Sequence, residues 1–492
     1  MSAPSPTTEQ AGVPAGPDPR RWLALAVIAV AQLMIVLDVS VVNIALPDAG
    51  ADLGITPANI QWVVTAYTLT FGGLLLLGGR IADFIGRKRA FLIGLGGFAI
   101  ASALGDVAAN QELLFGARAL QGAFAALLAP AALSLLAVTF TDPKERARAF
   151  GVFGAISGGG AAIGLILGGV LTEYASWRWT LGINVPIAAA TAFAAVALVT
   201  ESRATGDRRF DIPGVLLSAA GLASLVYGFN KAAEDGVGWS DPVTLALLAA
   251  AVVLLVGFVL RERSTSHPLL PLRVVLDRNR GGSYLVFLLV GAAMFAIFLF
   301  LTFYFQQTLG YTPLESGFAF LPFSGGIILG AGVVSQLLPR VGPRPLMVAG
   351  LLLAAVGMLW LTRIGVSSAY VTEVLPAEVV ISLGLAAVFV PASSTALVGV
   401  AEHDAGVASA VLNTSQQVGG SLGLALLSTF YASSVTGYLV DNPTAAPAQA
   451  LVHGYHVAFV WGAGFLALAL LLGAVLVSAR KDDLPADAAL AV

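Results

Sequence analysis

The sequence has no cysteine and few charged residues for its length. Cys 0 in 492 residues excludes disulfide bonds, thiol chemistry and cysteine-ligated metal sites. Charged residues make up 11% of the chain, whereas soluble domains carry about 25%. So few charges cannot cover a water-facing surface, and hydrophobic residues account for 58% of the sequence. We therefore expect most of the molecular surface to face lipid.

The motifs of several other protein classes are also missing. No Gly-x-x-x-x-Gly-Lys-[Ser/Thr] phosphate loop occurs, so the nucleotide site of an ATP-driven pump is absent from the sequence. No nucleophile–base arrangement is found, and the four histidines lack a further metal ligand. A channel would show repeated rings of identical polar residues, and none is seen. We expect a protein that is not an enzyme and has no metal, no cofactor and no nucleic-acid partner.

Apolar stretches long enough to cross a membrane recur along the whole chain. A spanning helix needs about 20 mostly apolar residues. Fourteen segments meet this condition, so we expect an all-α membrane protein. The expected spans are 22–46, 60–79, 90–107, 113–138, 147–171, 180–200, 213–230, 243–260, 283–305, 317–338, 346–362, 374–398, 406–433 and 456–478.

The basic residues gather on one side of these spans. With the N-terminus in the cytoplasm, Arg178, Lys231 and Arg363 fall on the outer side and Arg118 falls within a span. All the others of the 25 Lys and Arg residues then fall on cytoplasmic segments. The positive-inside rule predicts this bias. We therefore expect a multi-pass protein of the inner (plasma) membrane with both termini in the cytoplasm.

The order of the spans indicates an internal repeat. The loop after the second span (79–89) and the loop after the tenth (335–344) carry glycine and basic residues at matching offsets. Two six-helix halves around a central cavity are a common transporter plan. The expected parts are a disordered cytoplasmic tail (1–21), an N-terminal six-helix half (22–200), a linker with two extra transmembrane helices (201–280), a C-terminal six-helix half (281–478) and a cytoplasmic tail (479–492).

One acid and one base are expected at nearly the same depth in the membrane. At 1.5 Å per residue, Asp38 lies about 24 Å from the inner end of its span, and Arg118 lies roughly 8 Å from the outer end of its own. In a hydrocarbon core of about 30 Å these depths nearly coincide. Ionisable residues at such depth are costly and mark functional sites. We expect Asp38 to bind a proton from outside, with Arg118 tuning its proton affinity; the alternative is a static buried ion pair.

Several motifs occur along the chain in a specific order. The loop motif reads Gly79-x-Ile-Ala-Asp83-x-x-Gly86-Arg87-Lys88. The others are Leu37-Asp38-x-Ser-x-Val-Asn43-x-Ala-Leu-Pro47, Gln61-Trp62 with Tyr67, Arg118-x-x-Gln121-Gly122, Trp177-Arg178-Trp179 with Asn184-Val-Pro186, and Asn413-Thr-x-Gln-Gln417-x-Gly419-Gly420. Together they resemble the major facilitator superfamily, in particular its fourteen-spanner drug:proton antiporter branch of multidrug efflux transporters.

The resemblance implies the major-facilitator fold and adds roles to two glycine-containing segments. Gly79, Asp83, Gly86, Arg87 and Lys88 would form a gating loop, in which the glycines permit a tight turn and Asp83 either caps the next helix or pairs with a basic residue of the next loop. The alternative is a turn with ordinary positive-inside charge. Four glycines of the fifth span are expected to permit close helix packing: Gly160, Gly164, Gly168 and Gly169. The resemblance implies that they also act as a hinge.

Two positions depart from the family pattern. Leu165 stands where the antiporter signature of the fifth span has proline, and Phe84 occupies a commonly basic position of the loop motif. The first departure weakens the case for antiport and keeps proton symport open. The second would loosen the gate at the inner side.

Aromatic and amide groups at membrane depth suit bulky, partly apolar ligands. Each candidate also has the alternative of a place in the core or against lipid. Asp38 and Glu378 together predict an acidic cavity that favours cations, unless Glu378 lies at the outer interface. The candidate substrate-binding residues are Trp62, Tyr67, Gln121, Phe298, Tyr304, Phe305, Asn413, Gln417 and Glu378.

These observations predict proton-coupled efflux of amphipathic, often cationic, drugs or toxic small molecules. The proton gradient would supply the energy, and the lipid bilayer is the expected environment. The sequence is compatible with a monomer and does not define the oligomeric state. The alternatives are a dedicated exporter of one antibiotic or metabolite on the same fold, or a proton symporter.

Overall fold

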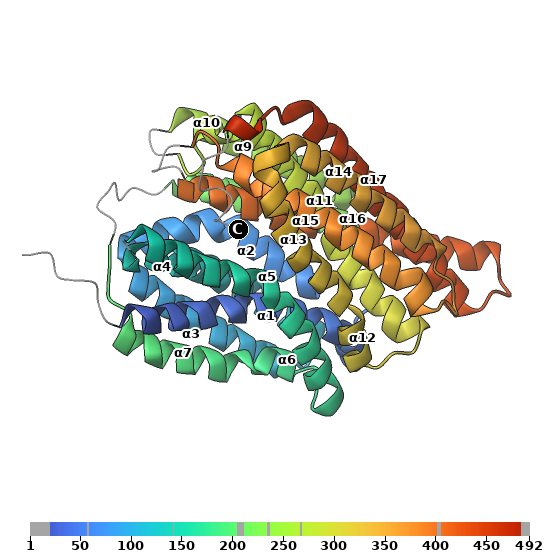
Figure 1. The fold of residues 1–492 in the computed structure, drawn as a ribbon. Helices are drawn as coiled ribbons and strands as arrows, with labels where there is room; N and C mark the ends of the chain where they lie inside the picture. The colour runs from blue at the N-terminus through green and yellow to red at the C-terminus, as the bar shows by residue number, and fades with distance from the viewer. Residues whose placement is uncertain are drawn as a thin grey trace, which may run out of the picture.

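The computed structural model of the protein contains only helices in the part of the chain that it describes (Figure 1). Within that part, 14 helices are long and apolar enough to cross a membrane. Each predicted span overlaps one of them, so the prediction of an all-α membrane protein is confirmed. The predicted tails 1–21 and 479–492 lie largely outside the described residues. The structure describes residues 20–483 except 57–58, 141, 204–210, 234–236, 266–267 and 401–404.

The N-terminal half occupies the blue-to-green side of the molecule in Figure 1. Its last span is interrupted at Ile183, where α6 ends and α7 begins. Its helices are α1 (Arg21–Leu53), α2 (Trp62–Ile85), α3 (Arg87–Asp106), α4 (Gln111–Thr139), α5 (Pro143–Tyr174), α6 (Trp179–Gly182) and α7 (Asn184–Leu198).

The C-terminal half, yellow to red in Figure 1, follows the same order of helices. Short π-helical turns lie after α11 and before α15, and a 3-10 turn follows α14. Its elements are α11 (Arg278–Phe303), η1 (Tyr304–Thr308), α12 (Pro313–Ala319), α13 (Leu321–Val341), α14 (Pro343–Trp360), η2 (Leu361–Arg363), η3 (Tyr370–Val374), α15 (Leu375–Ala396), α16 (Ala405–Asp441) and α17 (Pro447–Leu476).

Two extra spans, α8 (Ile212–Ala233) and α9 (Pro242–Ser264), connect the halves and are followed by the short α10 (Leu272–Val275). The α8 helix packs against α2 of one half and α16 of the other. Its Tyr227 ring lies 6.0 Å from the Trp62 ring at the start of α2. At the other end of the pair, Arg261 Nε lies 3.0 Å from Asp211 Oδ1. The extra pair therefore covers the seam between α2 and α16.

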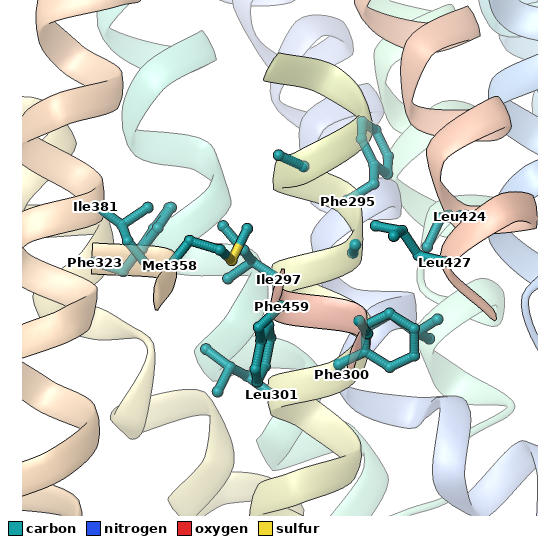
Figure 2. Packing of buried hydrophobic residues seen from close by; sticks show 14 of the residues in the cluster. Phe295, Ile297, Phe300, Leu301, Phe323, Met358, Ile381, Leu424, Leu427 and Phe459 are labelled. Atoms are coloured by element: carbon teal, nitrogen blue, oxygen red, sulfur yellow. The ribbon is translucent and has the colours of Figure 1, made fainter. Parts of the chain in front are cut away.

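Each half is held together by a dry core of aromatic and aliphatic side chains. In the C-terminal half, α11 lies at the centre and packs against α15, α16 and α17. Burial of such side chains contributes about 1.5–3 kcal/mol each in water, and close packing takes over this role inside lipid. Figure 2 shows Phe295, Ile297, Phe300, Leu301, Phe323, Met358, Ile381, Leu424, Leu427 and Phe459 of this core.

The two halves contact each other along α2 and α16, and again at one end of the bundle. We name the end with the loop 79–89 and Arg344 the basic face, and the other end the opposite face. Near the opposite face, Gln306 Nε2 donates a hydrogen bond to Ile44 O at 2.9 Å, and Leu314 N donates one to Glu173 Oε2 at 3.1 Å. A Cβ added to Gly169 would lie 2.6 Å from Leu314 Cα. The halves are thus closed toward the opposite face.

Candidate transport site

A buried ion pair joins the first and fourth helices of the N-terminal half. Arg118 Nη1 lies 2.6 Å from Asp38 Oδ2, and both residues are 1% exposed. The depth argument from the sequence predicted this contact, and the structure confirms that the two residues meet. An isolated charge in this environment is very costly, so each residue requires the other.

Two further side chains, in addition to Arg118, contact the carboxylate of Asp38. Its Oδ1 accepts a hydrogen bond from Gln121 Nε2 at 3.0 Å and one from Asn184 Nδ2 at 2.9 Å. Gln121 lies one helical turn after Arg118 on α4, and Asn184 is the first residue of α7. All three partners present N–H donors, which match an ionised carboxylate because it only accepts. Asp38 therefore ties α1 to both α4 and α7.

Arg118 is held by more than its ion pair. Its Nε donates to Val63 O at 2.9 Å, and its Nη1 also donates to Gln121 Oε1 at 2.8 Å. The Tyr67 ring lies under the guanidinium, with 4.5 Å from Cζ to the ring centroid. The planar guanidinium of arginine carries several N–H donors at its edge and can stack on a ring with its face, so it can make all these contacts at once. Sequence analysis missed Ser102, whose Oγ lies 2.7 Å from Gln121 Nε2.

A cavity of about 1010 Å³ lies between the halves and reaches the basic face. It is lined by α1, α2, α4 and α5 of the N-terminal half, by α11 and α16 of the C-terminal half, and by the segment around Pro268 and Arg273. Arg80 and Asp83, at the end of α2, mark its mouth. With the opposite face closed, the structure holds a cavity that is open on one side of the bundle.

The α1 helix separates the ion pair from this cavity. Gln32, Val36, Ser40 and Asn43 line the cavity, and their spacing of three to four residues places them on one helix face. Asp38 lies on another face and is not among the lining residues. The sequence did not reveal this arrangement, because α1 is apolar on nearly every face and its periodicity does not distinguish them.

The predicted substrate-binding residues divide into two groups. Phe298, Asn413 and Gln417 line the cavity. Among the predicted residues that do not line it, Tyr67 and Gln121 belong to the ion-pair network. The other residues outside the lining are Trp62, beside α8, and Tyr304, Phe305 and Glu378, in the interior of the C-terminal half.

Among the described residues, the lining is amide-rich and carries charged residues at its mouth alone, and it is not acidic as the sequence suggested. Asp38 and Glu378 both lie outside it, and Asp83 at the mouth is the one carboxylate among its described members. The mouth also carries Arg80 and Arg273. Amide and hydroxyl groups that were not among the predicted substrate-binding residues add hydrogen-bonding capacity. They are Gln32, Ser40, Asn43, Ser134, Ser409 and Gln416.

The loop between α2 and α3 depends on a residue that the sequence motif does not include. Glu201, after α7, accepts hydrogen bonds from Lys88 N at 3.1 Å and Arg89 N at 3.3 Å. Its carboxylate therefore caps α3, the role considered for Asp83. Asp83 instead pairs with Arg87 of its own loop, 3.3 Å from Oδ1 to Nη2. Lys88 Nζ donates to Val196 O at 2.8 Å.

The two glycines of this loop have different settings. Gly86 has φ +110°, a backbone conformation that side chains rarely adopt, and an added Cβ would lie 2.6 Å from the Glu201 carboxylate. Gly79 lies inside α2, where a Cβ would make an ordinary contact of 3.5 Å with Pro130. The turn therefore requires Gly86, and the expectation that Gly79 also forms the turn is wrong.

The glycines of α5 allow close contact with two neighbours. A Cβ on Gly160, Gly164 or Gly168 would lie within 3 Å of Val36, Ser40 or Val41 of α1. Gly169 turns instead toward α12 of the other half. The predicted close packing is confirmed, whereas the hinge role stays a prediction. Leu165, in the place of the family proline, is fully buried and lines the cavity.

No cluster of three or more potential metal ligands occurs among the described residues. The features found together are an all-helical membrane bundle, a cavity open at one face and a buried ion pair beside it. These features define a secondary transporter, the class in which two helical halves expose a central site to either side in turn.

A model of the Major Facilitator Superfamily matches residues 28–424, and the chain belongs to this family of transporters. It is 51% identical over 473 residues to the "Puromycin resistance protein pur8" of Streptomyces alboniger, covering 95% of this chain and 93% of the relative. It is 38% identical to the "Cephamycin export protein CmcT" of Amycolatopsis lactamdurans, with 94% of each chain covered. The "Multidrug resistance protein Stp" of Mycobacterium tuberculosis is 31% identical, covering 85% of this chain and 77% of the relative.

Solved structures agree on the fold. A bacterial homologue of the human lysosomal transporter Spinster, in an inward-facing and unoccupied conformation, superposes with a TM-score of 0.66. The match covers 96% of this chain and all of that one, at 16% identity. An auto-inhibited POT family peptide transporter gives a TM-score of 0.65 at 17% identity, with 91% and 96% covered. At this identity the likeness concerns the fold alone.

Proposed function

We propose that this protein exports amphipathic antibiotics or other toxic small molecules across the plasma membrane in exchange for protons. The basic face and both termini lie in the cytoplasm, so the cavity takes up its cargo from that side. The observation that carries the proposal is the fully buried Asp38–Arg118 pair beside the cavity. The names of the relatives, which refer to resistance and export, support the direction of transport.

The proton acts on Asp38. Protonation removes the charge that Arg118 faces and turns one carboxylate oxygen into a donor, which no longer matches the N–H groups of Gln121 and Asn184. The ties from α1 to α4 and α7 then weaken together. We propose that this change favours rearrangement of α1, the helix whose other face lines the cavity.

Coupling is therefore indirect in this account. The sequence predicted an acidic cavity that includes Asp38 and attracts cations, but Asp38 lies outside the lining in the conformation described. Bound cargo instead contacts Gln32, Ser40 or Asn43, and its presence is transmitted through α1. Because one chain supplies both halves of the cavity, we propose that the monomer is the working unit.

The breadth of the cargo range can be tested directly. The neutral amides of the lining suit cargo rich in hydrogen-bonding groups, whereas the mouth carries Arg80, Arg273 and Asp83, which is paired with Arg87. A dedicated exporter of one compound is the second candidate. It is favoured by relatives whose names refer to single antibiotics, such as the "Tetracenomycin C resistance and export protein" of Streptomyces glaucescens. Proton symport remains the third.

The test uses purified protein in proteoliposomes with an imposed pH gradient and a panel of cationic dyes and neutral antibiotics. We expect uphill movement of several unrelated compounds against the proton flow, and its loss in Asp38→Asn. Glu112→Gln, an exposed acid at the start of α4, is the matched control and should retain transport. Movement of one compound alone supports the dedicated exporter, and flux that ignores both pH gradient and voltage contradicts proton coupling.

A further inference from the structure

A second acid lies buried in the membrane, in the C-terminal half. Glu378, in the first turn of α15, is 0% exposed. It has no ion pair among the described residues, in contrast to Asp38, and its Oε1 has no hydrogen-bond partner. Its Oε2 lies 3.2 Å from the hydroxyl of Tyr370, the first residue of η3. A carboxylate with one neutral contact and no counterion is very costly at this depth.

The hydrogen bonds of Tyr370 indicate that the carboxyl group of Glu378 carries a proton. The hydroxyl also lies 2.7 Å from Ala319 O at the end of α12. A backbone carbonyl only accepts, so the single proton of the hydroxyl goes to this shorter contact. The contact with Glu378 is then a hydrogen bond only if Glu378 supplies the proton. The geometry therefore fits a protonated carboxylic acid that donates to Tyr370.

No other charged or titratable group takes over this role in the described surroundings. Those on the neighbouring elements have other contacts: Glu373 accepts from Ser368, Glu315 accepts from the α12 backbone, Arg363 lies by the Trp360 ring, and His456 contacts Ile364 O. The remaining neighbour is Tyr311, which stacks on Phe305 at 5.8 Å. Phe305 in turn contacts the Tyr370 ring. Glu378 is thus enclosed by aromatic and apolar groups.

A hollow at the opposite face reaches Tyr370, the hydrogen-bond partner of this acid. It has a volume of about 400 Å³ and is lined by Tyr311, Glu315, Phe318, Ala319 and Tyr370. Tyr370 therefore contacts both the hollow and Glu378. A hydroxyl that both donates and accepts can pass a proton between water and an acid. This hollow lies on the side away from the mouth of the cavity.

The position of Glu378 in its helix matches a charged position of the N-terminal half. Arg118 precedes Pro130 in α4, and Glu378 precedes Pro391 in α15 at a spacing that differs by one residue. Both helices are the fourth span of their half. The repeat therefore places an ionisable group at corresponding depths, paired in one half and unpaired in the other.

We propose that Glu378 is a second proton-binding site, located in the C-terminal half and exchanging its proton with the opposite face through Tyr370. The inference rests on the proposed function, because it adds a second proton to a proton-coupled exporter. In the conformation with the cavity open to the basic face, this site is loaded while Asp38 is paired with Arg118. The two acids then take up protons in different states of the cycle.

The first test measures the carboxylic acid directly. Infrared difference spectra of the reconstituted protein should show the C=O band of a protonated carboxylic acid near neutral pH. We expect the band in wild type and in Asp38→Asn, its absence in Glu378→Gln, and a shifted frequency in Tyr370→Phe, which lacks the hydroxyl. A wild-type spectrum without the band, or a band unaffected by both substitutions, overturns the proposal.

The second test counts protons per molecule of drug in proteoliposomes. Glu378→Gln should still export but move one proton fewer per cycle than wild type. Glu315→Gln is the matched control, since it lines the same hollow and glutamine preserves its capping box. An unchanged count in Glu378→Gln overturns the second site. Wild type that moves no protons at all overturns the proposed function instead, so the two failures are distinguishable.

Discussion

Arg118 shows how one side chain can connect three helices of a bundle through four contacts. Its guanidinium contacts Asp38 of α1, Gln121 of its own helix, the backbone of Val63 in α2 and the ring of Tyr67. A lysine ammonium is a point charge on a flexible chain and cannot reach the same set of partners at once. The identity of this base therefore matters beyond its charge.

We predict that Arg118→Lys reduces the maximal rate of proton-driven export at least about tenfold, equivalent to roughly 1.4 kcal/mol. The charge that pairs with Asp38 remains, but the bond to Val63 O and the fit to the Tyr67 ring are lost. Initial rates in proteoliposomes measure the effect. Arg148→Lys, the same substitution at an exposed position of α5, should leave the rate unchanged. Equal rates in both variants would contradict this role.

The carboxylate network was partly predictable at the scale of single residues. Depth along each helix is enough to bring Asp38 and Arg118 together, because helical rise is constant. Ser102 and Glu201 carry no comparable signal, since a serine in α3 and an acid after α7 are ordinary in sequence. Their roles arise from contacts between segments that are distant along the chain.

At the scale of helices, glycines determine how closely α5 approaches α1. A Cβ at Gly164 would lie 1.9 Å from Ser40 Oγ, which is itself bonded to the backbone of α1. Ser40 Oγ cannot move away without losing its hydrogen bonds, and the added Cβ cannot move away unless α5 separates from α1. Larger residues in such a contact cost about 1–3 kcal/mol.

We predict that Gly164→Ala lowers the apparent melting temperature of the purified protein in detergent. The added methyl group forces α1 and α5 apart. Gly159→Ala on the same helix meets nothing within 4 Å and should leave the melting temperature unchanged or raise it slightly. A Gly164→Ala protein as stable as the Gly159→Ala control would show that the two helices do not depend on this close contact.

The start of α3 depends on one turn residue. We predict that Gly86→Ala destabilises the protein by about 1–3 kcal/mol, because its φ is unfavourable for a side chain and the Cβ would displace Glu201. Gly96→Ala, inside α3 and without neighbours within 4 Å, is the control. Chemical denaturation in detergent measures both. Similar stability of the two variants would exclude strain at Gly86.

The spans were predictable because hydrophobic length is a strong signal. Their irregularities were not. The break at Ile183 positions Asn184 toward Asp38, and the π turn Tyr304–Thr308 ends α11. Such local changes of backbone depend on neighbouring helices and leave no clear pattern in composition. The face that each helix turns to the cavity could not be predicted either, because helices that are apolar on nearly every face show no clear periodicity.

At the scale of the whole molecule, the structure represents one state of a cycle. The halves touch near the opposite face through Gln306 and Glu173, and the cavity reaches the basic face. Alternating access requires the reverse arrangement in another state. The α8–α9 pair covers the seam between α2 and α16, so it must tolerate the movement of both.

The absence of cysteine makes the open side directly measurable. We predict that Ser409→Cys, in the cavity, reacts with a membrane-impermeant maleimide in inverted vesicles and not in spheroplasts. Asn442→Cys, exposed beyond α16 at the opposite face, should show the reverse pattern. Ile100→Cys, on an exposed apolar surface of α3, should react in neither. Labelling of Ser409→Cys from the same side as Asn442→Cys would contradict the assigned open side.

The central claim is that protons move against the cargo because of the Asp38–Arg118 pair. The most direct measurement loads proteoliposomes with drug at equal pH on both sides and follows the internal pH with a trapped dye. As drug leaves, wild type should carry protons in the other direction and acidify the interior. In the Glu378→Gln background, where Asp38 is the remaining proton carrier, Asp38→Asn should move drug without a pH change. Drug flux in wild type without proton movement, or proton movement retained after Asp38→Asn in that background, would contradict the account.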